Sequence, residues 1–295
     1  MLPFFRMDAS LHGPATARLV APRVSLASCV RACLLRNTMH RPELPREQRL
    51  NRFPASPHCS LTWFIQGTCV MVDPPPELPP RPSPPVLFAG PQERPTISYN
   101  PGQVHAFMVL FFPQAMHALT GLDISRHVNE FSLIEDVLDA GWQAMAREVS
   151  AAPDDAARIA LLEQFLEPRW QAARARGAAP GHLIGDWVQA LSLHAATSSW
   201  GRSVRHLERR IKAWAGQPMR RLRRLSRAEH SFLRTRDALT AGDPVAWAEL
   251  AAEDGYSDQA HLCREVRDIT GHSLTELARA ARSDDESYWV YRIWS

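Results

Sequence analysis

Two segments of the chain repeat one another at an offset of 55 residues, and they carry side chains suited to hydrogen bonding with flat polar groups. The segment 205–219 aligns with 260–274, and the identical pairs are His206 with His261, Leu207 with Leu262, Arg209 with Arg264 and Gly216 with Gly271. Arginine presents a planar fork of N–H donors that fits a carboxylate, a phosphate or the edge of a guanine base. Residues of this kind indicate recognition of another molecule.

The sequence carries none of the short motifs that accompany catalysis or nucleotide binding. It has no Gly-x-Ser-x-Gly, no phosphate-binding loop and no dinucleotide fingerprint. Four histidines of the first half show neither metal-ligand spacing nor a triad-like arrangement: His58, His105, His117 and His127. We therefore expect no enzymatic activity and no cofactor. The alternative, a metal-dependent barrel enzyme fused to a helical domain, would require an ordered cluster of histidines and glutamates.

The cysteines raise a second alternative. Cys29, Cys33, Cys59 and Cys69 would suffice for a four-cysteine zinc centre, which would make the protein an alkylation- or redox-responsive regulator. Nine residues separate the last pair, whereas zinc sites usually use a close C-x2-C, and thiols in strands are commonly buried. Cys263 makes the total odd, which argues against a disulfide framework. We expect no metal site.

Each copy of the repeat has the pattern of an amphipathic helix. Apolar residues stand at 207, 211 and 214 in the first copy and at 262, 266 and 269 in the second, one face of a helix in each case. Ser203 and Asp258 occupy equivalent N-cap positions. Gly216 and Gly271 stand where a left-handed residue commonly ends a helix.

A shorter helical stretch precedes each copy. These stretches cover 186–196 and 244–253, and glycine-containing turns at 200–201 and 255–256 follow them. Helix, tight turn and capped second helix is the helix-turn-helix plan. The alternative of a helical solenoid usually requires three or more copies of a shorter repeat.

Basic residues gather in and after the first copy. Residues 202–227 hold ten basic side chains and one acid, whereas 245–282 carry four arginines against seven acids. Wound as a helix, 218–240 places apolar residues on one side (Met219, Leu222, Leu225, Phe232, Leu233 and Leu239) and basic residues on the other (Arg220, Arg223, Arg224, Arg227 and Arg234). Such a helix can lie on a membrane. Its place between the two copies favours contact with phosphates.

These motifs resemble the AraC/XylS family of bacterial transcription regulators. The resemblance covers about 185–280 and depends on Ser203-x-Arg-x-Leu-x-Arg209 with Gly216, and on Gly255-Tyr-Ser-Asp-Gln-Ala-His-Leu262 with Arg264 and Gly271. It implies two helix-turn-helix units, joined by a long helix, that bind double-stranded DNA. The implied base- or phosphate-contacting residues are Arg202, Ser203, Arg205, His206, Arg209, Asp258, Gln259, Ala260, His261 and Arg264, and the basic face of the long helix adds Arg220, Arg223, Arg224 and Arg227. Arg202, Met219 and Leu274 depart from the family pattern.

The resemblance also sets the expected partners. Around 86–92 and 102–121 the first half is similar to the β-rich amino-terminal domain of some of these regulators, which implies that it binds a small-molecule effector or mediates formation of a homodimer. The acidic surface of the second unit is a candidate contact for RNA polymerase. No apolar run is long enough to cross a membrane, and Arg6 and Asp8 interrupt the start, which argues against a secretory signal. We therefore expect a cytoplasmic protein.

The expected fold class is α+β. Short β-forming stretches (29–35, 60–72, 96–99 and 104–112) predict a small antiparallel barrel or sandwich, and the patterns of 114–121, 132–149 and 154–170 predict flanking helices. Eight prolines within 74–85 predict an extended loop. The predicted segments are a flexible leader (1–20), a β-rich sensing or dimerisation domain (21–150), a connecting helix and linker (151–181), an all-α double helix-turn-helix domain (182–282) and an aromatic tail that packs on it (283–295).

Overall fold

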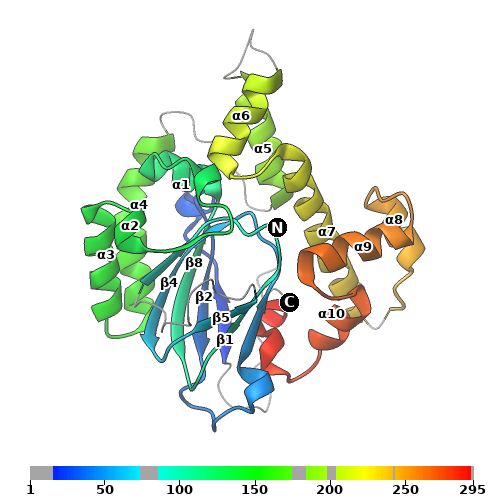
Figure 1. Ribbon diagram of the computed structural model, residues 1–295, viewed down its shortest axis with the longest axis horizontal. Helices are drawn as coiled ribbons and strands as arrows, with labels where there is room; N and C mark the ends of the chain where they lie inside the picture. Colours follow the sequence, from blue (N-terminus) through cyan, green and yellow to red (C-terminus); the bar gives the residue numbers. More distant parts are fainter. Residues whose placement is uncertain (1–15, 74–85, 175–183, 198–203, 242, 294–295) are drawn as a thin grey trace.

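The computed structural model describes residues 16–73, 86–174, 184–197, 204–241 and 243–293. Within these ranges the chain has an α+β fold, with its strands between residues 17 and 133 and its α-helices from residue 113 onwards (Figure 1). The predicted fold class is thus confirmed. The proline-rich segment 74–85, the expected linker around 177–181, the predicted turn at 200–201 and the residues Arg202 and Ser203 lie outside the described residues.

The strands form two antiparallel sheets. The six-stranded sheet has the order β1 (Ala17–Val20), β2 (Val30–Asn37), β8 (His105–Phe111), β4 (Cys59–Gln66), β6 (Val86–Ala89) and β9 (Phe131–Leu133). The three-stranded sheet has the order β3 (Leu50–Phe53), β7 (Thr96–Tyr99) and β5 (Val70–Asp73). Residues 17–20, which we predicted to be leader, are paired with β2. The predicted single stretch 60–72 is two strands in different sheets.

The central strand β8 of the six-stranded sheet is apolar on both faces from Ala106 to Phe111, and its neighbour β4 carries Ser60, Thr62 and Phe64 on its second face. In β8, Phe107, Val109 and Phe111 point into the main core, while the alternating Met108 and Leu110 face a pocket on the other side. Successive side chains of a strand point to opposite faces, so an apolar residue at every position requires cover on both sides. The sheet therefore separates a packed core from an internal cavity.

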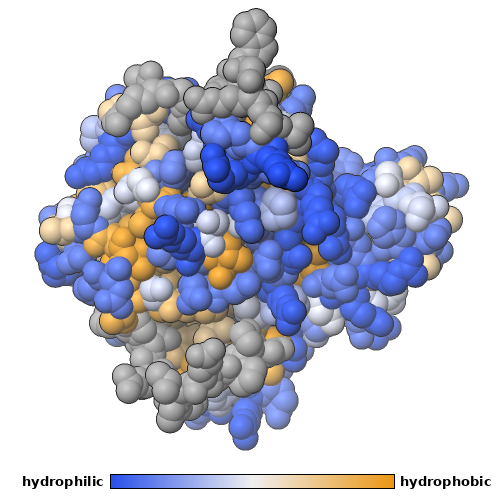
Figure 2. Space-filling view, turned by 45° about the horizontal axis from the view of Figure 1, so that its top comes forward, coloured by the Kyte–Doolittle hydropathy of each residue, from blue (hydrophilic) through white to orange (hydrophobic). Residues whose placement is uncertain are grey.

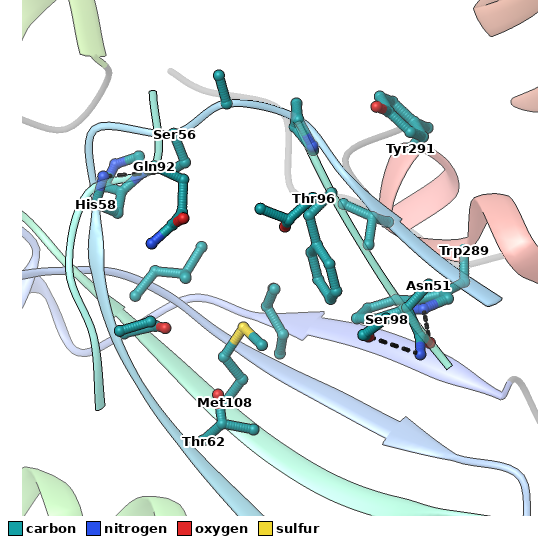
Figure 3. A pocket seen from close by; sticks show the side chains of 18 of the residues that line it. Asn51, Ser56, His58, Thr62, Gln92, Thr96, Ser98, Met108, Trp289 and Tyr291 are labelled. Carbon is teal, nitrogen blue, oxygen red and sulfur yellow. Dashed lines mark hydrogen bonds between the residues drawn. The ribbon is translucent and has the colours of Figure 1, made fainter. Parts of the chain in front are cut away.

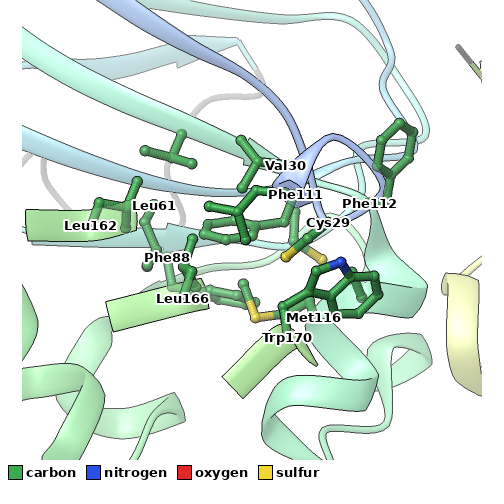
Figure 4. Close-up of a cluster of buried hydrophobic side chains, with 14 of the residues drawn as sticks. Cys29, Val30, Leu61, Phe88, Phe111, Phe112, Met116, Leu162, Leu166 and Trp170 are labelled. Carbon is green, nitrogen blue, oxygen red and sulfur yellow. The ribbon is translucent and has the colours of Figure 1, made fainter. Parts of the chain in front are cut away.

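Helices α1 (Pro113–Thr120), α2 (Ile134–Val137), α3 (Ala140–Ala151) and α4 (Asp155–Arg174) lie beside the core face of the sheet (Figure 1). Figure 4 shows Leu162, Leu166 and Trp170 of α4 packed towards Phe88 and Phe111 of the sheet. The predicted helix 132–149 is in fact β9, α2 and α3. The buried indole of Trp63 has a hydrogen-bond partner, because its Nε1 donates to the carbonyl of Ala146 at 3.0 Å.

The carboxy-terminal helices are α5 (Ile184–Thr197), α6 (Val204–Ala215), α7 (Met219–Ala241), α8 (Trp247–Glu253), α9 (Gln259–Thr270) and α10 (Leu274–Ala280). The predicted caps of α9 are confirmed, because Asp258 Oδ1 accepts from the backbone N–H of His261 at 2.6 Å and Gly271 has φ +77°. Gly216 ends α6 in the same way, with φ +74°. The apolar residues of the two repeats are turned inwards as expected.

The main core does not end with the β-rich half. Trp187 of α5 is 1% exposed and its ring lies 5.9 Å from that of Phe112. Ile211 and Trp214 of α6 belong to the same apolar cluster. At Gly216 an added Cβ would lie about 3.0 Å from Val128 of the first half, so α6 ends in close contact with it. The helices α5 and α6 are therefore bound to the β-rich half.

The aromatic tail forms a short 3-10 turn (Glu286–Tyr288) and α11 (Trp289–Ile293). It contacts α10, as the prediction of packing on the helical half requires, but it also packs on β1 and β3. Trp289 Nε1 donates to Asn51 Oδ1 on β3 at 2.8 Å. The tail thus joins the last helices to the strands. Within the described residues, no helix is both long and apolar enough to span a membrane.

Candidate ligand pocket and nucleic-acid interface

A cavity of about 450 Å³ lies between the sheets and the carboxy-terminal helices. Its walls come from both halves: strands β2, β4, β7 and β8 on one side, and α7, α9 and α11 on the other. Thr62 and Met108 of the sheet face Tyr291 and Trp289 of the tail across it (Figure 3). The volume falls within the range of small-molecule sites, and most lining side chains are apolar.

One end of this pocket carries a buried histidine. His58 is 7% exposed, and its Nδ1 lies 3.0 Å from Ser56 Oγ, while its Nε2 has no hydrogen-bond partner among the described residues. Burial, followed by the positive charge of Arg31, lowers the pKa of His58 to about 3. The imidazole is therefore neutral at physiological pH and leaves one hydrogen-bonding position unused.

The opposite end carries an amide network. Asn51 Nδ2 donates to Asn100 Oδ1 at 2.7 Å and to Ser98 Oγ at 3.2 Å, and Asn51 Oδ1 accepts from Trp289 (Figure 3). These polar groups satisfy one another, so this end of the pocket is held by strands β3 and β7 together with the tail.

Ion pairs cross between the two halves at the pocket walls. Arg31 Nη2 on β2 donates to Glu229 Oε1 on α7 at 3.3 Å. Arg36, further along β2, donates from Nη1 to Glu286 Oε2 of the tail at 2.5 Å. Each arginine that lines the pocket therefore faces a carboxylate from the carboxy-terminal part of the chain.

Helix α6 presents the predicted residues of the first repeat. Arg205 and Arg209 are exposed, and Arg209 Nη2 lies 3.0 Å from Nδ1 of the half-buried His206. Figure 2 shows a predominantly hydrophilic surface over the region of α6 and α7. The face of α6 opposite the core thus carries basic side chains that solvent, or another molecule, can reach.

Helix α9 presents the corresponding residues of the second repeat. Gln259, Ala260 and Arg264 are exposed. Asp258 serves as the N-cap, and Nδ1 of His261 lies 3.2 Å from the hydroxyl of Ser257, so these two side chains take part in ordering the start of the helix.

The basic residues of α7 divide into two sets. Arg220 and Arg223 are exposed. Arg224 and Arg227 instead hold Glu265 of α9, at 2.9 Å and 3.0 Å, and the carboxylate side chain is only 3% exposed. Arg234 similarly pairs with Asp254 at 3.0 Å. The acidic excess of the second repeat is therefore neutralised in part by the helix that precedes it.

No cluster of three or more metal-binding side chains is found among the described residues. Cys29, Cys33 and Cys59 belong to the apolar core between the sheet and its helices. Burial raises the pKa of each thiol, to about 12 for Cys33, where the charge of Glu163 adds to the effect. These thiols are therefore protonated in this structure and pack as small apolar side chains.

Sequence reasoning did not locate the pocket. Its signal is present in β4 and β8, where apolar or small residues occupy both faces of each strand: Leu61 and Trp63 alternate with Thr62 and Phe64. An amphipathic strand with solvent on one side would alternate with charged residues.

Comparisons with known proteins give a likeness of fold alone. No family model and no curated protein matches the sequence. Among solved structures, ToxT from Vibrio cholerae is similar at a TM-score of 0.40 and 9% identity over 80% of this chain and 96% of that chain. A structure of ToxT from Vibrio cholerae O395 gives a TM-score of 0.37 at 8% identity, covering 80% and 95% of the two chains. An unsaturated fatty acid-bound ToxT gives 0.33 at 10% identity, covering 80% and 94%.

Proposed function

We propose that this protein is a sequence-specific DNA-binding transcription regulator of the AraC type, without catalytic activity, that acts in the cytoplasm. In this proposal α5–α6 and α8–α9 are two helix-turn-helix units, and α6 and α9 are their recognition helices. The observation that supports it best is the presence of two 12-residue helices, α6 and α9, that share a sequence pattern and an exposed polar face. Each buries its apolar face and ends at a left-handed glycine.

Helix α7 connects the two units. Helix α5 packs on α7 in the first unit, and α9 packs on α7 in the second, where its Glu265 contacts Arg224 and Arg227. In the proposal, the two recognition helices held on this shared helix enter successive major-groove segments on one face of the duplex.

The exposed charges support unequal roles for the two units. Arg205, Arg209, Arg220 and Arg223 are exposed on α6 and α7, where they would bind phosphates or bases. The second unit would contribute chiefly through base contacts of Gln259 and His261. Arg202 and Ser203 remain part of the proposed interface by sequence pattern alone.

The pocket gives a route by which a small effector would control DNA binding. Val266 and Ile269 of α9 line it together with Leu225 and Phe232 of α7. A ligand changes a conformational equilibrium only if it contacts the two states differently. Because the walls come from the strands and from α9 itself, an effector here would alter how the second unit is held against the first half.

The proposal is tested with the full chain, since α5 and α6 share a core with the strands. We expect the protein to select genomic DNA fragments, with an affinity that falls steeply as salt rises because phosphate contacts release counterions. Replacing Arg205 and Arg209 together by alanine should reduce the salt dependence by about two contacts. Replacement of the exposed Arg147 on α3 is the control. Salt-independent binding, or no binding to any fragment, would contradict the proposal.

Two further partners belong to the proposal. RNA polymerase would contact the acidic residues of α8, of which Glu249 is exposed. A second copy of the chain would form a homodimer through the β-rich half.

A further inference from the structure

We infer that the pocket selects uncharged, mainly apolar molecules, and that Glu229 enforces this selection by neutralising Arg31. The inference rests on the proposed function, since it names the chemical class of the effector.

The charged side chains of the pocket wall are already paired with one another or with neighbouring residues. Arg31 and Arg36 are the basic residues among those that line it, leaving aside the neutral His58. Arg31 is 14% exposed and Glu229 21% exposed, so their ion pair is largely shielded from water. Arg36 and Glu286 are more buried still, at 6% and 10%. Both lining cations thus already have an anionic partner inside the fold.

Because both arginines are already paired with carboxylates, the pocket is unfavourable for an anionic ligand. A carboxylate loses its hydration when it enters an apolar site, and that loss is offset only by a close and available cation. In this pocket it would have to compete with Glu229 for Arg31 or with Glu286 for Arg36. A neutral molecule meets no such penalty and gains from the apolar walls.

The apolar walls come from both halves of the chain. Leu34, Met108 and Leu110 project from the sheet, and Leu225, Phe232 and Ile269 project from α7 and α9. A molecule with an extended hydrocarbon part would replace empty space by contacts with both sets of side chains. The same contacts would connect the strands to the second unit.

The test compares two probes of equal chain length, 1-decanol and decanoate, by isothermal titration calorimetry on the full chain at neutral pH. We expect 1-decanol to bind at least about tenfold more tightly than decanoate, which corresponds to about 1.4 kcal/mol. Glu229→Gln should remove the negative charge that faces Arg31 and raise the affinity for decanoate by about tenfold. Glu148→Gln, an exposed glutamate on α3, is the matched control and should leave the preference unchanged.

Tighter binding of decanoate than of 1-decanol by the unaltered protein overturns the inference, as does binding of neither probe or a preference that Glu229→Gln does not move. DNA affinity is measured separately. Loss of DNA binding with an intact preference for 1-decanol would refute the regulator and leave the pocket chemistry standing.

Discussion

Arg36 and Glu286 are 250 residues apart in the sequence, and their side chains form a buried ion pair of 2.5 Å. Thr16 Oγ1 donates to the same carboxylate oxygen at 2.7 Å, and the Arg36 guanidinium lies 5.4 Å from the ring centroid of Trp289. The pair binds the tail to β2, and it does so at the wall of the pocket. The stability of the helical part and the shape of the pocket therefore depend on the same contact.

Glu286→Gln should destabilise the whole chain by about 3–5 kcal/mol, because it leaves the buried Arg36 without a counter-charge. Urea denaturation of the full chain measures this change. Glu43→Gln is the matched control, since Glu43 also pairs with an arginine, Arg49, but is 71% exposed; it should cost about 1 kcal/mol or less. Equal effects of the two substitutions would show that the buried pair does not join the tail to the strands.

Alanine substitution at Arg205 and at Gln259 separates the roles of the two proposed recognition helices. If Arg205 reads a guanine, its loss should cost about 1–3 kcal/mol of binding free energy on the true operator. Gln259→Ala should relax preference at one base pair and leave non-specific affinity nearly unchanged. Fluorescence anisotropy on the operator and on mutated half-sites measures both. The assignment is reversed if Gln259→Ala abolishes all DNA binding while Arg205→Ala is silent.

Substitution of Arg223 and of Arg227 tests whether the basic residues of α7 divide into exposed residues that bind DNA and residues that stabilise the fold. Arg223 is exposed, so Arg223→Ala should weaken DNA binding on all sequences and leave the free energy of unfolding nearly unchanged. Arg227 holds the buried Glu265, so Arg227→Ala should lower the free energy of unfolding by about 1–3 kcal/mol. Denaturation and DNA titration are measured for both variants. The opposite pattern would place Arg227 on the phosphates instead.

His58 predicts a pH dependence of stability. Its pKa is lowered to about 3 by burial and then by the charge of Arg31, whereas in the unfolded chain it should be near 6.5. Below about pH 6.5 the unfolded chain takes up a proton that the folded chain refuses, so stability is full above that pH and is lost as pH falls towards 3. The loss should be about 2 kcal/mol between pH 6.5 and about pH 5. His58→Gln should remove this component, and an unchanged slope in that variant would contradict the assignment.

The local features of the helical half follow from the sequence alone. The apolar spacing of 262, 266 and 269, the cap at Asp258 and the left-handed Gly271 each depend on residues within a few positions of one another. Helix geometry converts such spacings directly into a buried face and two ends. The repeated segment at 205–219 led to the same correct expectation for α6, apart from the cap at Ser203, which lies outside the described residues.

The partners of charged residues were decided by the tertiary structure. The sequence shows Arg224 and Arg227 as part of one basic face, yet the packing of α9 on α7 brings Glu265 between them. In the same way, Arg31 and Glu229 meet only because β2 and α7 form opposite walls of one cavity. Helical and strand periodicity set which side of an element is apolar, but they contain no information about which element will cover it. That choice depends on contacts between residues far apart in the chain, and it created both the pocket and its balance of charge.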